Sequence, residues 1–368
     1  MRPEGQVYPL ELSRIFVRKV WGSRSLGTAL GLEIENLPSI GELWETFDGR
    51  EQGSIVLNGR HRLTPLRDIV REMGTDLLGT RLAEYVDQPF PLLIKYLFPS
   101  QALSVQVHPD DAYALRVEHC LGKTEMWIVL TTYPDSFIFM GWKPGFDRRQ
   151  IVEALKKGPL DAVIRRIRPK VGEVYLVPAG TVHALGPGVG VMELQQHSHI
   201  TYRIHDWDRP GEDGKPRELH FDKALEVLDY EYRPNYRIEP LSVTDGHNTF
   251  VYMCACRYFA ACRWILERPL ELNSDPARFW VLSVIDGGGV LHYGGGETVV
   301  LERTSVVVIP AAMGSFRIEP LPRLELIKSW IPDLAADIVA PLRRAGFSTQ
   351  RIAALGGQGR GNDLLAIA

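Results

Sequence analysis

The stretch Gly172-Glu-Val-Tyr-Leu-Val-Pro178-Ala-Gly180-Thr-Val-His183 decides the interpretation of this chain. Its apolar residues favour a β-strand, and Pro178, which cannot donate a ladder hydrogen bond, suits the end of that strand. Gly180 can take the positive φ of a tight turn. The stretch therefore predicts a strand, a turn and a second strand, with His183 presented just beyond the turn.

Short strands separated by turns dominate the rest of the chain. Segments rich in β-formers lie at 89–97, 102–108, 124–130, 137–141, 172–202, 251–266, 279–284, 289–293 and 305–309. Many short strands punctuated by Gly and Pro are typical of β-barrels or sandwiches. We therefore expect a mainly β fold.

A few short helices interrupt the strands. The best-defined is Arg148–Lys157, because Asp147 and Gln150 form a capping box and Gly158 follows as a terminator. Further helical patterns lie at 63–72, 112–118, 223–228 (with Asp222 as its cap), 333–342 and 349–355.

A degenerate copy of the opening stretch occurs later in the chain. Thr304-Ser-Val-Val-Val-Ile-Pro310-Ala-Ala312 repeats its spacing, with Thr304 in place of the first glycine. Ser315 stands where the first copy has His183. We expect the second copy to keep the strand and turn but to lack the histidine ligand.

Bulk composition narrows the possible partners. The 368 residues predict two or three domains, and 42 Lys plus Arg against 45 Asp plus Glu give a net charge of -3. That balance argues against a nucleic acid or an anionic membrane as the main partner. No C-x2-C pair, signal core or membrane-length apolar run is present, so we expect a reducing, cytoplasmic location.

Ser104-Val-Gln106-Val-His108 is the second informative stretch. In a strand, Ser104, Gln106 and His108 share one face, while Val105 and Val107 share the other. An outward apolar face and an inward polar face suit a barrel whose lumen is a site. The alternative is an amphipathic strand with its polar face in solvent.

Gly122-Lys123-Thr124-Glu125 adds a carboxylate to this pattern, because Lys123 and Glu125 also share a strand face. Glu125 could complete a ligand set with Gln106, His108 and His183. Two imidazoles, one carboxylate and one amide oxygen suit Zn²⁺ or a similar divalent ion. Such a centre keeps positive charge and remains a Lewis acid.

A third stretch runs from Glu193 to Arg209. Alternation places Glu193 and Gln195 on one face, and Arg203 shares a face with His205. The charged residues near Arg209 could form a solvated turn. Arginines beside a metal site in a chain of near-neutral charge instead indicate an anionic ligand such as phosphate.

These motifs carry two resemblances. The spacing Gly-x5-Pro-x-Gly-x2-His resembles the second signature of the cupin superfamily, in which the histidine binds a metal. Between about Val20 and Pro332 the chain resembles type I mannose-6-phosphate isomerase in its short bacterial form. The supporting pieces are Val20-Trp-Gly, Gly41-Glu-Leu-Trp, Pro91-Leu-Leu-Ile-Lys95, Ser104-Val-Gln-Val-His-Pro-Asp-Asp, Gly122-Lys-Thr-Glu, Pro178-Ala-Gly-Thr-Val-His-Ala and Tyr202-Arg-Ile-His-Asp-Trp-Asp-Arg.

The resemblance implies roles for individual residues. It assigns one zinc ion per chain to four ligands, which are Gln106, His108, Glu125 and His183. Arg203 matches the active-site arginine, and Lys123 and Glu193 match further polar residues of the pocket. Ser104, Lys95 and Arg209 fall where groups facing the phosphate or the sugar are expected.

The resemblance also implies an architecture of two cupin-type, jelly-roll β-barrels. We expect N-terminal strands and a helix at 1–90, a metal-binding cupin at 91–235, a metal-free cupin at 236–332 and a helical extension at 333–368. The oligomeric state is left open.

The implied reaction interconverts mannose 6-phosphate and fructose 6-phosphate through a metal-stabilised enediol. Glu193 is our first choice for the base, Lys123 the second and His205 the third. Two alternatives stay open: a cupin oxygenase that uses Fe²⁺, and a cupin that binds a sugar phosphate without converting it.

Overall fold

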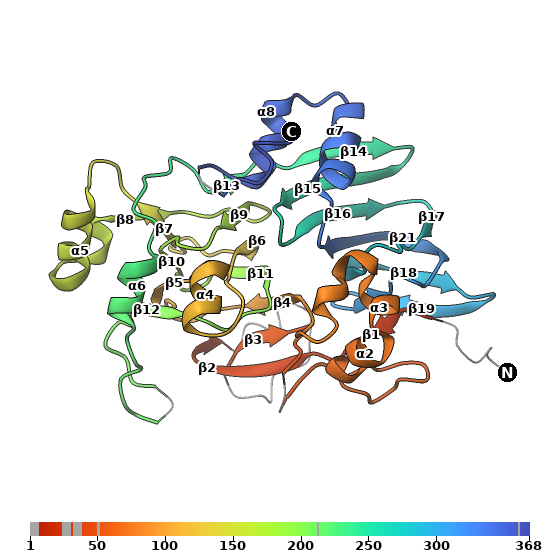
Figure 1. Cartoon of the computed structure of the whole chain (residues 1–368), viewed down its shortest axis with the longest axis horizontal. Coiled ribbons are helices and arrows are strands. Elements are labelled where there is room, and N and C mark those ends of the chain that lie inside the picture. The colour runs from red at the N-terminus through yellow and green to blue at the C-terminus, as the bar shows by residue number, and fades with distance from the viewer. Residues whose placement is uncertain (1–6, 24–30, 32–38, 50–51, 212, 360) are drawn as a thin grey trace.

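The structure is a computed structural model that describes residues 7–23, 31, 39–49, 52–211, 213–359 and 361–368. Antiparallel sheets dominate it, which confirms the predicted mainly β fold. Two halves lie side by side (Figure 1), one built on five- and seven-stranded sheets and the other on a nine-stranded sheet. These counts refer to the described residues.

The half nearer the N-terminus is a sandwich of two sheets. One has the strand order β12-β5-β10-β7-β8, and the other has the order β13-β9-β6-β11-β4-β3-β2. The first contains β5 (Val105–Val107), β7 (Ile138–Trp142), β8 (Ile164–Ile167), β10 (His183–Leu185) and β12 (Tyr202–His205). The second contains β2 (Ile15–Ser23), β3 (Ile40–Trp44), β4 (Leu92–Leu97), β6 (Glu125–Thr131), β9 (Val174–Val177), β11 (Gly190–Gln196) and β13 (Arg237–Ile238).

The other half follows the order β1-β20-β18-β21-β16-β15-β14, with β17 on β21 and β19 on β18. Its strands are β1 (Leu10–Glu11), β14 (Leu241–Asp245), β15 (Asn248–Ala255), β16 (Ala260–Leu266), β17 (Leu270–Asn273), β18 (Trp280–Tyr293), β19 (Glu297–Leu301), β20 (Val306–Ile309) and β21 (Ser315–Trp330). The two strands predicted at 279–284 and 289–293 are one long strand, β18. Pairing with β21 continues across its register shifts, so the glycines between the two segments bend the strand without ending it.

Helices cover the outer surfaces. They are α2 (Leu66–Met73), α3 (Thr75–Leu78), η1 (Thr80–Tyr85), α4 (Asp111–Val117), α5 (Arg148–Lys157), η2 (Leu160–Ala162), α6 (Phe221–Val227), η3 (Leu334–Val339), α7 (Ala340–Arg344), α8 (Thr349–Ala353) and η4 (Ala354–Gly356). The capping box of α5 is confirmed: Asp147 accepts from the Gln150 backbone, and the Gln150 side chain accepts from the Asp147 backbone. The predicted cap of α6 is wrong, because that helix begins at Phe221 and Asp222 lies within its first turn.

Alternation along β4 explains how the layers stack. Leu92, Ile94 and Tyr96 belong to the large apolar cluster that extends into the nine-stranded sheet. Lys95, between them in sequence, points to the opposite face and lines a cavity within the sandwich. The seven-stranded sheet thus has an apolar face against the other half, and its opposite face carries the polar site beside an apolar cluster that includes Leu97 and Val191.

The five-stranded sheet is arranged in the same way. Val105 and Val107 pack in one apolar cluster with Ile151 of α5 and Ala224 of α6, and Gln106 between them lines the cavity. The predicted apolar outer face of this strand is therefore covered by helices, and its polar face lies inside the sandwich.

The N-terminal strands do not stand apart from the two halves. β2 and β3 extend the seven-stranded sheet through β4, and β1 pairs with β20 of the nine-stranded sheet. In Figure 1 the C-terminal helices α7 and α8 lie together above β13, β14 and β15. The division at residues 90, 235 and 332 stays a prediction.

The two copies of the repeated stretch share a backbone shape. Gly172 and Thr304 take φ values of 86° and 72°, and β10 and β21 begin at His183 and Ser315 respectively. His183 is buried whereas Ser315 is exposed. The second copy thus has the strand and the turn, and it presents a solvent-facing hydroxyl at the position of the imidazole.

Two further observations concern the described residues. Cys120, Cys254, Cys256 and Cys262 are free thiols. None of the described helices combines the length and the apolar character needed to cross a bilayer.

Alanine at Gly180 should destabilise the protein more than alanine at Gly172. Both glycines have φ near 85°, where a side chain costs about 1–2 kcal/mol. A Cβ on Gly180 would also lie 3.0 Å from the Val227 carbonyl oxygen, whereas one on Gly172 meets nothing within 4 Å. Chemical denaturation should therefore show an additional loss of at least about 1 kcal/mol for Gly180→Ala, as overpacking typically costs. Equal losses in the two variants would contradict this account of the turn.

Candidate metal centre and substrate cavity

Three buried side chains from both sheets of the sandwich converge on one point. His108 follows β5, His183 begins β10 and Glu125 begins β6, and one ligand atom from each lies within 4.8 Å of the others. Each is only 1% exposed. The backbone joins two of these segments directly, because the Gly180 N–H donates to the His108 carbonyl at 2.8 Å.

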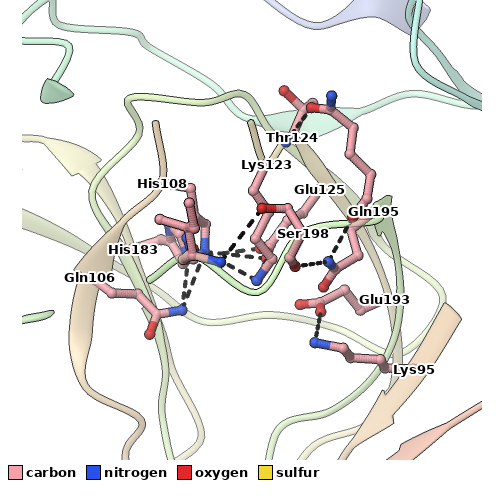
Figure 2. A network of polar contacts seen from close by, with 12 residues as sticks. Lys95, Gln106, His108, Lys123, Thr124, Glu125, His183, Glu193, Gln195 and Ser198 are labelled. Carbon is pink, nitrogen blue, oxygen red and sulfur yellow. Dashed lines mark hydrogen bonds and ion pairs between the residues drawn. The ribbon is translucent and has the colours of Figure 1, made fainter. Parts of the chain in front are cut away.

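Backbone carbonyls orient both imidazoles. His108 Nδ1 lies 2.6 Å from the Ile200 oxygen, and His183 Nδ1 lies 2.8 Å from the Thr181 oxygen. A proton on Nδ1 leaves Nε2 with a free lone pair. Both Nε2 atoms face Glu125, at 3.3 Å from Oε1 for His108 and 3.7 Å from Oε2 for His183 (Figure 2).

Gln106 completes the group. Its Nε2 lies 3.2 Å from His183 Nε2 and 3.5 Å from His108 Nε2, and its Oε1 accepts from the Ser104 hydroxyl at 3.1 Å. A metal ligand needs the amide oxygen on the imidazole side, and a half-turn of the amide would exchange the two atoms. All four residues predicted as ligands therefore lie together.

Lys123 controls the charge of this cluster. Its Nζ lies 2.5 Å from Glu125 Oε1 and 3.4 Å from His108 Nε2. Burial alone would raise the pKa of Glu125, but the charge of Lys123 holds that pKa well below its usual range. Burial and the same ammonium lower the pKa of His108 to about 3. An ionised carboxylate beside neutral imidazoles is the donor state that a divalent metal requires.

The cluster fits a divalent cation. Both Glu125 oxygens are buried, and neither forms a hydrogen bond to the described residues, so the carboxylate retains acceptor capacity beyond its ion pair. Two oriented imidazoles and this carboxylate match the nitrogen and oxygen donors of zinc sites.

A cavity of about 400 Å³ opens beside the cluster. Cations outnumber carboxylates among the described residues that line it. The cations are Lys19, Lys95, Lys123, Arg203 and Arg217, and the carboxylates are Glu42 and Glu193. This excess of positive charge favours an anionic ligand.

Strand register builds one wall of this cavity. Trp44 of β3 pairs with Lys95 of β4, which pairs with Glu193 of β11, which pairs with Trp127 of β6. The Lys95 ammonium lies 5.0 Å from the centre of the Trp44 ring and 3.7 Å from Glu193 Oε1. Trp127 Nε1 donates to Glu193 Oε2 at 3.0 Å. The four residues form a single row across the sheet.

Glu193 is the acid in this row, and its pKa is shifted far from the usual value. Burial, reinforced by the negative charge of Glu125, raises the pKa of Glu193 to about 7. A carboxylate with a pKa near neutrality suits a general base. Lys123 differs, because its ion pair with Glu125 outweighs burial and raises its pKa.

The three arginines of this region have different surroundings. Arg203 lines the cavity beside Gln106, its register partner, and its buried Nε has no hydrogen-bond partner among the described residues. Arg209 and Arg217 both pair with Asp206, at 2.7 and 2.5 Å. Arg217 lines the cavity, but Arg209 does not, and Arg209 Nη1 donates instead to the Ala102 carbonyl at 2.6 Å.

The structure thus brings together nearly all the side chains predicted for the site. Ser104, Lys95, Lys123, Glu193 and Arg203 line the cavity beside the four ligands, whereas Arg209 and His205 do not line it. The residue roles stay predictions.

Sequence reasoning assigned no role to several lining residues, which are Lys19, Glu42, Trp44, His199, Arg217 and His220. Glu42 and Trp44 carried a signal, because they stand two residues apart in the quoted piece Gly41-Glu-Leu-Trp and would share one face of a strand. Arg217 lies outside the strands and helices and carried no periodic signal.

Comparison with known proteins finds two family models that each match part of the chain. The catalytic domain of type I phosphomannose isomerase matches residues 10–135, and the cupin domain of mannose-6-phosphate isomerase matches residues 248–331. The second match confirms the predicted cupin relationship for the half built on the nine-stranded sheet.

Individual relatives match over nearly their whole length. Mannose-6-phosphate isomerase ManA of Bacillus subtilis (strain 168) is 34% identical over 320 residues, which is 84% of this chain and 96% of that protein. Mannose-6-phosphate isomerase of Streptococcus mutans is 31% identical, covering 87% and 98%. The crystal structure of the mannose 6-phosphate isomerase from Bacillus subtilis superposes with a TM-score of 0.79 at 32% identity, covering 88% and 99%. The predicted resemblance is confirmed, and the chain belongs to the type I mannose-6-phosphate isomerase family.

Proposed function

We propose that this chain interconverts mannose 6-phosphate and fructose 6-phosphate in a metal-dependent aldose–ketose isomerisation. One observation carries the proposal: the buried cluster of His108, Glu125 and His183 adjoins a cavity rich in cationic side chains. Membership of the isomerase family agrees with this chemistry.

The proposed cofactor is one Zn²⁺ per chain, held by Gln106, His108, Glu125 and His183. When bound, the cation supplies positive charge that stabilises negative charge developing on the substrate oxygens and lowers the pKa of nearby acids. The Nδ1 contacts to backbone carbonyls hold both imidazoles ready for this role.

Glu193 is the proposed base. Its carboxylate would accept the proton from C1 or C2 of the open-chain sugar and return it to the neighbouring carbon. Its raised pKa matches that task near neutral pH. Lys123, protonated through its pair with Glu125, would serve as a proton donor or a fixed positive charge for the oxygens, together with Arg203.

The phosphate is proposed to lie among the remaining polar side chains. Ser104 and Lys95 face the cavity as the sequence predicts, and Arg217 adds a cation there. Arg209 supports Asp206, which in turn holds Arg217. Binding through several such contacts orients the reacting end, and orientation can supply about 7 kcal/mol of barrier lowering in favourable cases.

The two alternatives differ in what they require. A cupin oxygenase would require an uncharged, hydrophobic pocket, whereas this cavity is lined by charged groups. A protein that binds the sugar phosphate without converting it would have the same charges, and only an assay of turnover separates it from the isomerase. The cytoplasmic location also stays a prediction, in agreement with the four free thiols.

The metal proposal predicts that His183→Ala loses zinc and activity together. Removing one ligand should lower zinc content, measured by mass spectrometry of the purified protein, and should lower isomerase activity by more than about 100-fold, because even supporting residues cost ~10–100-fold. A coupled assay that detects fructose 6-phosphate, run with and without a chelator, measures the activity.

His61→Ala is the matched control, because His61 is also buried but lies outside the cavity. It should retain zinc and turnover. Full zinc occupancy and full turnover in His183→Ala would exclude the metal site, whereas a zinc-loaded wild type without turnover would favour the non-converting alternative.

A second prediction separates Arg217 from Arg209. Both pair with Asp206, but only Arg217 lines the cavity. Arg217→Met should raise KM for mannose 6-phosphate by about tenfold or more, as expected for the loss of one charged contact, with a smaller change in kcat. Arg209→Met should raise KM less. A larger rise in KM for Arg209→Met than for Arg217→Met would instead assign the phosphate contact to Arg209.

The pH profile tests Glu193. A base must be deprotonated, so kcat/KM should fall as the pH drops through the pKa of Glu193, which is about 7 without the metal and lower with it. Glu193→Gln should reduce kcat about 100–10,000-fold and remove this acidic limb. The substrate phosphate also ionises, with a second pKa of about 6, and the effect of that ionisation on kcat/KM remains in the variant. If Glu193→Gln shows the same acidic limb as the wild type, the base is another residue.

A further inference from the structure

A second cavity lies in the other half of the molecule, on one face of the nine-stranded sheet. Its volume is about 240 Å³, and three tryptophans from neighbouring strands line it: Trp264 of β16, Trp280 of β18 and Trp330 of β21. None of them lines the candidate active site.

Lys328 of β21 lies among these rings. Its Nζ is 3.5 Å from the centre of the Trp280 ring, 4.5 Å from that of Trp330 and 5.5 Å from that of Trp264. The indole faces attract the ammonium charge. Among the described residues, none forms a hydrogen bond or an ion pair with Nζ, so a cation faces the cavity without an anionic partner.

The two nearby carboxylates make their short contacts with other groups, and one arginine pairs with both of them. Arg278 pairs with Asp275, at 2.9 Å from Nε to Oδ2, and with Asp337. Asp337 Oδ2 also accepts from Trp330 Nε1 at 3.1 Å and from the Asp333 N–H at 2.7 Å. The charges of Arg278 and Lys328 together balance those of Asp275 and Asp337. The Lys328 ammonium is not directly paired with either carboxylate among the described residues, so it can still donate to a ligand.

The Lys328 side chain does not fill the space between the strands, because a cavity remains beside it. That space is at the small end for ligand pockets, which typically measure about 300–1,000 Å³, so it suits a small molecule. Flat indole faces pack against the C–H face of a sugar ring, and an ammonium binds an anionic group. The candidate active site shows the same combination, with Lys95 over Trp44.

We propose that this cavity binds a monosaccharide that carries one anionic group, with Lys328 at the anion and the tryptophans against the ring. Asp337 closes one side of the site from η3, which lies beyond residue 331, where the matched cupin domain ends. Burial lowers the pKa of Lys328 to about 8, so the anion should bind less well as the pH rises above that value.

The test uses ¹⁹F NMR of the full, zinc-loaded chain labelled with 5-fluorotryptophan. The chain has 8 tryptophans, and single Trp→Phe variants assign the resonance of each one. The probe is methyl α-mannopyranoside 6-phosphate, whose locked ring prevents isomerisation. Saturable shifts of the Trp264, Trp280 and Trp330 resonances are expected, and methyl α-mannopyranoside and inorganic phosphate should each shift them less. A carboxylated probe, methyl glucuronide, tests whether the anion must be a phosphate.

Lys328→Met should weaken the binding of the probe, measured at these three resonances, by at least about tenfold. Isomerase activity and the responses of Trp44 and Trp127 should stay unchanged, which separates this site from the proposed active site. Lys328→Arg keeps the charge and should retain most of the binding. The proposal is overturned if the three resonances do not move at tens of millimolar probe, or if Lys328→Met binds as tightly as the wild type.

Discussion

The carboxylate of Glu125 is almost fully buried, and the candidate site is organised around that buried charge. An isolated carboxylate in such a place would be neutralised by taking up a proton. Lys123 prevents this by direct pairing, and the two imidazoles turn their Nε2 atoms toward the same carboxylate. A buried negative charge that faces neutral nitrogen donors favours the binding of a cation. The strands of the sandwich hold these side chains in their positions.

Those positions depend on the different surroundings of the two faces of each sheet. In both sheets of the sandwich, alternate residues of a strand face either an apolar layer or the cavity, as Tyr96 and Lys95 do on β4. The apolar layers differ: helices cover the five-stranded sheet, and the other half of the molecule covers the seven-stranded sheet. Because both outer faces are packed, part of each inner face can be polar without loss of the core, while the remainder forms an apolar cluster between the two sheets.

The nine-stranded half illustrates what happens when a fold is repeated without its ligands. The strand and turn persist, with Thr304 in the conformation of Gly172, and a solvent-facing serine replaces the buried histidine. In this half the Lys328 ammonium lies against indole rings. The charged group of its cavity therefore faces aromatic rings, whereas the Glu125 carboxylate of the other half faces two imidazoles.

The sequence by itself determined the mainly β fold and the helix cap at Asp147, because strand alternation and helix capping act over a few residues. The family resemblance of its motifs indicated the four predicted ligands, which lie together in the structure. The sequence could not determine which strands become neighbours. The row from Trp44 to Trp127 spans four strands whose pairing is set by register. Arg217 lines the cavity whereas Arg209 does not, although both pair with Asp206, and the Arg209 guanidinium is held instead by the Ala102 carbonyl. Such contacts depend on packing between distant segments, which only the tertiary structure decides.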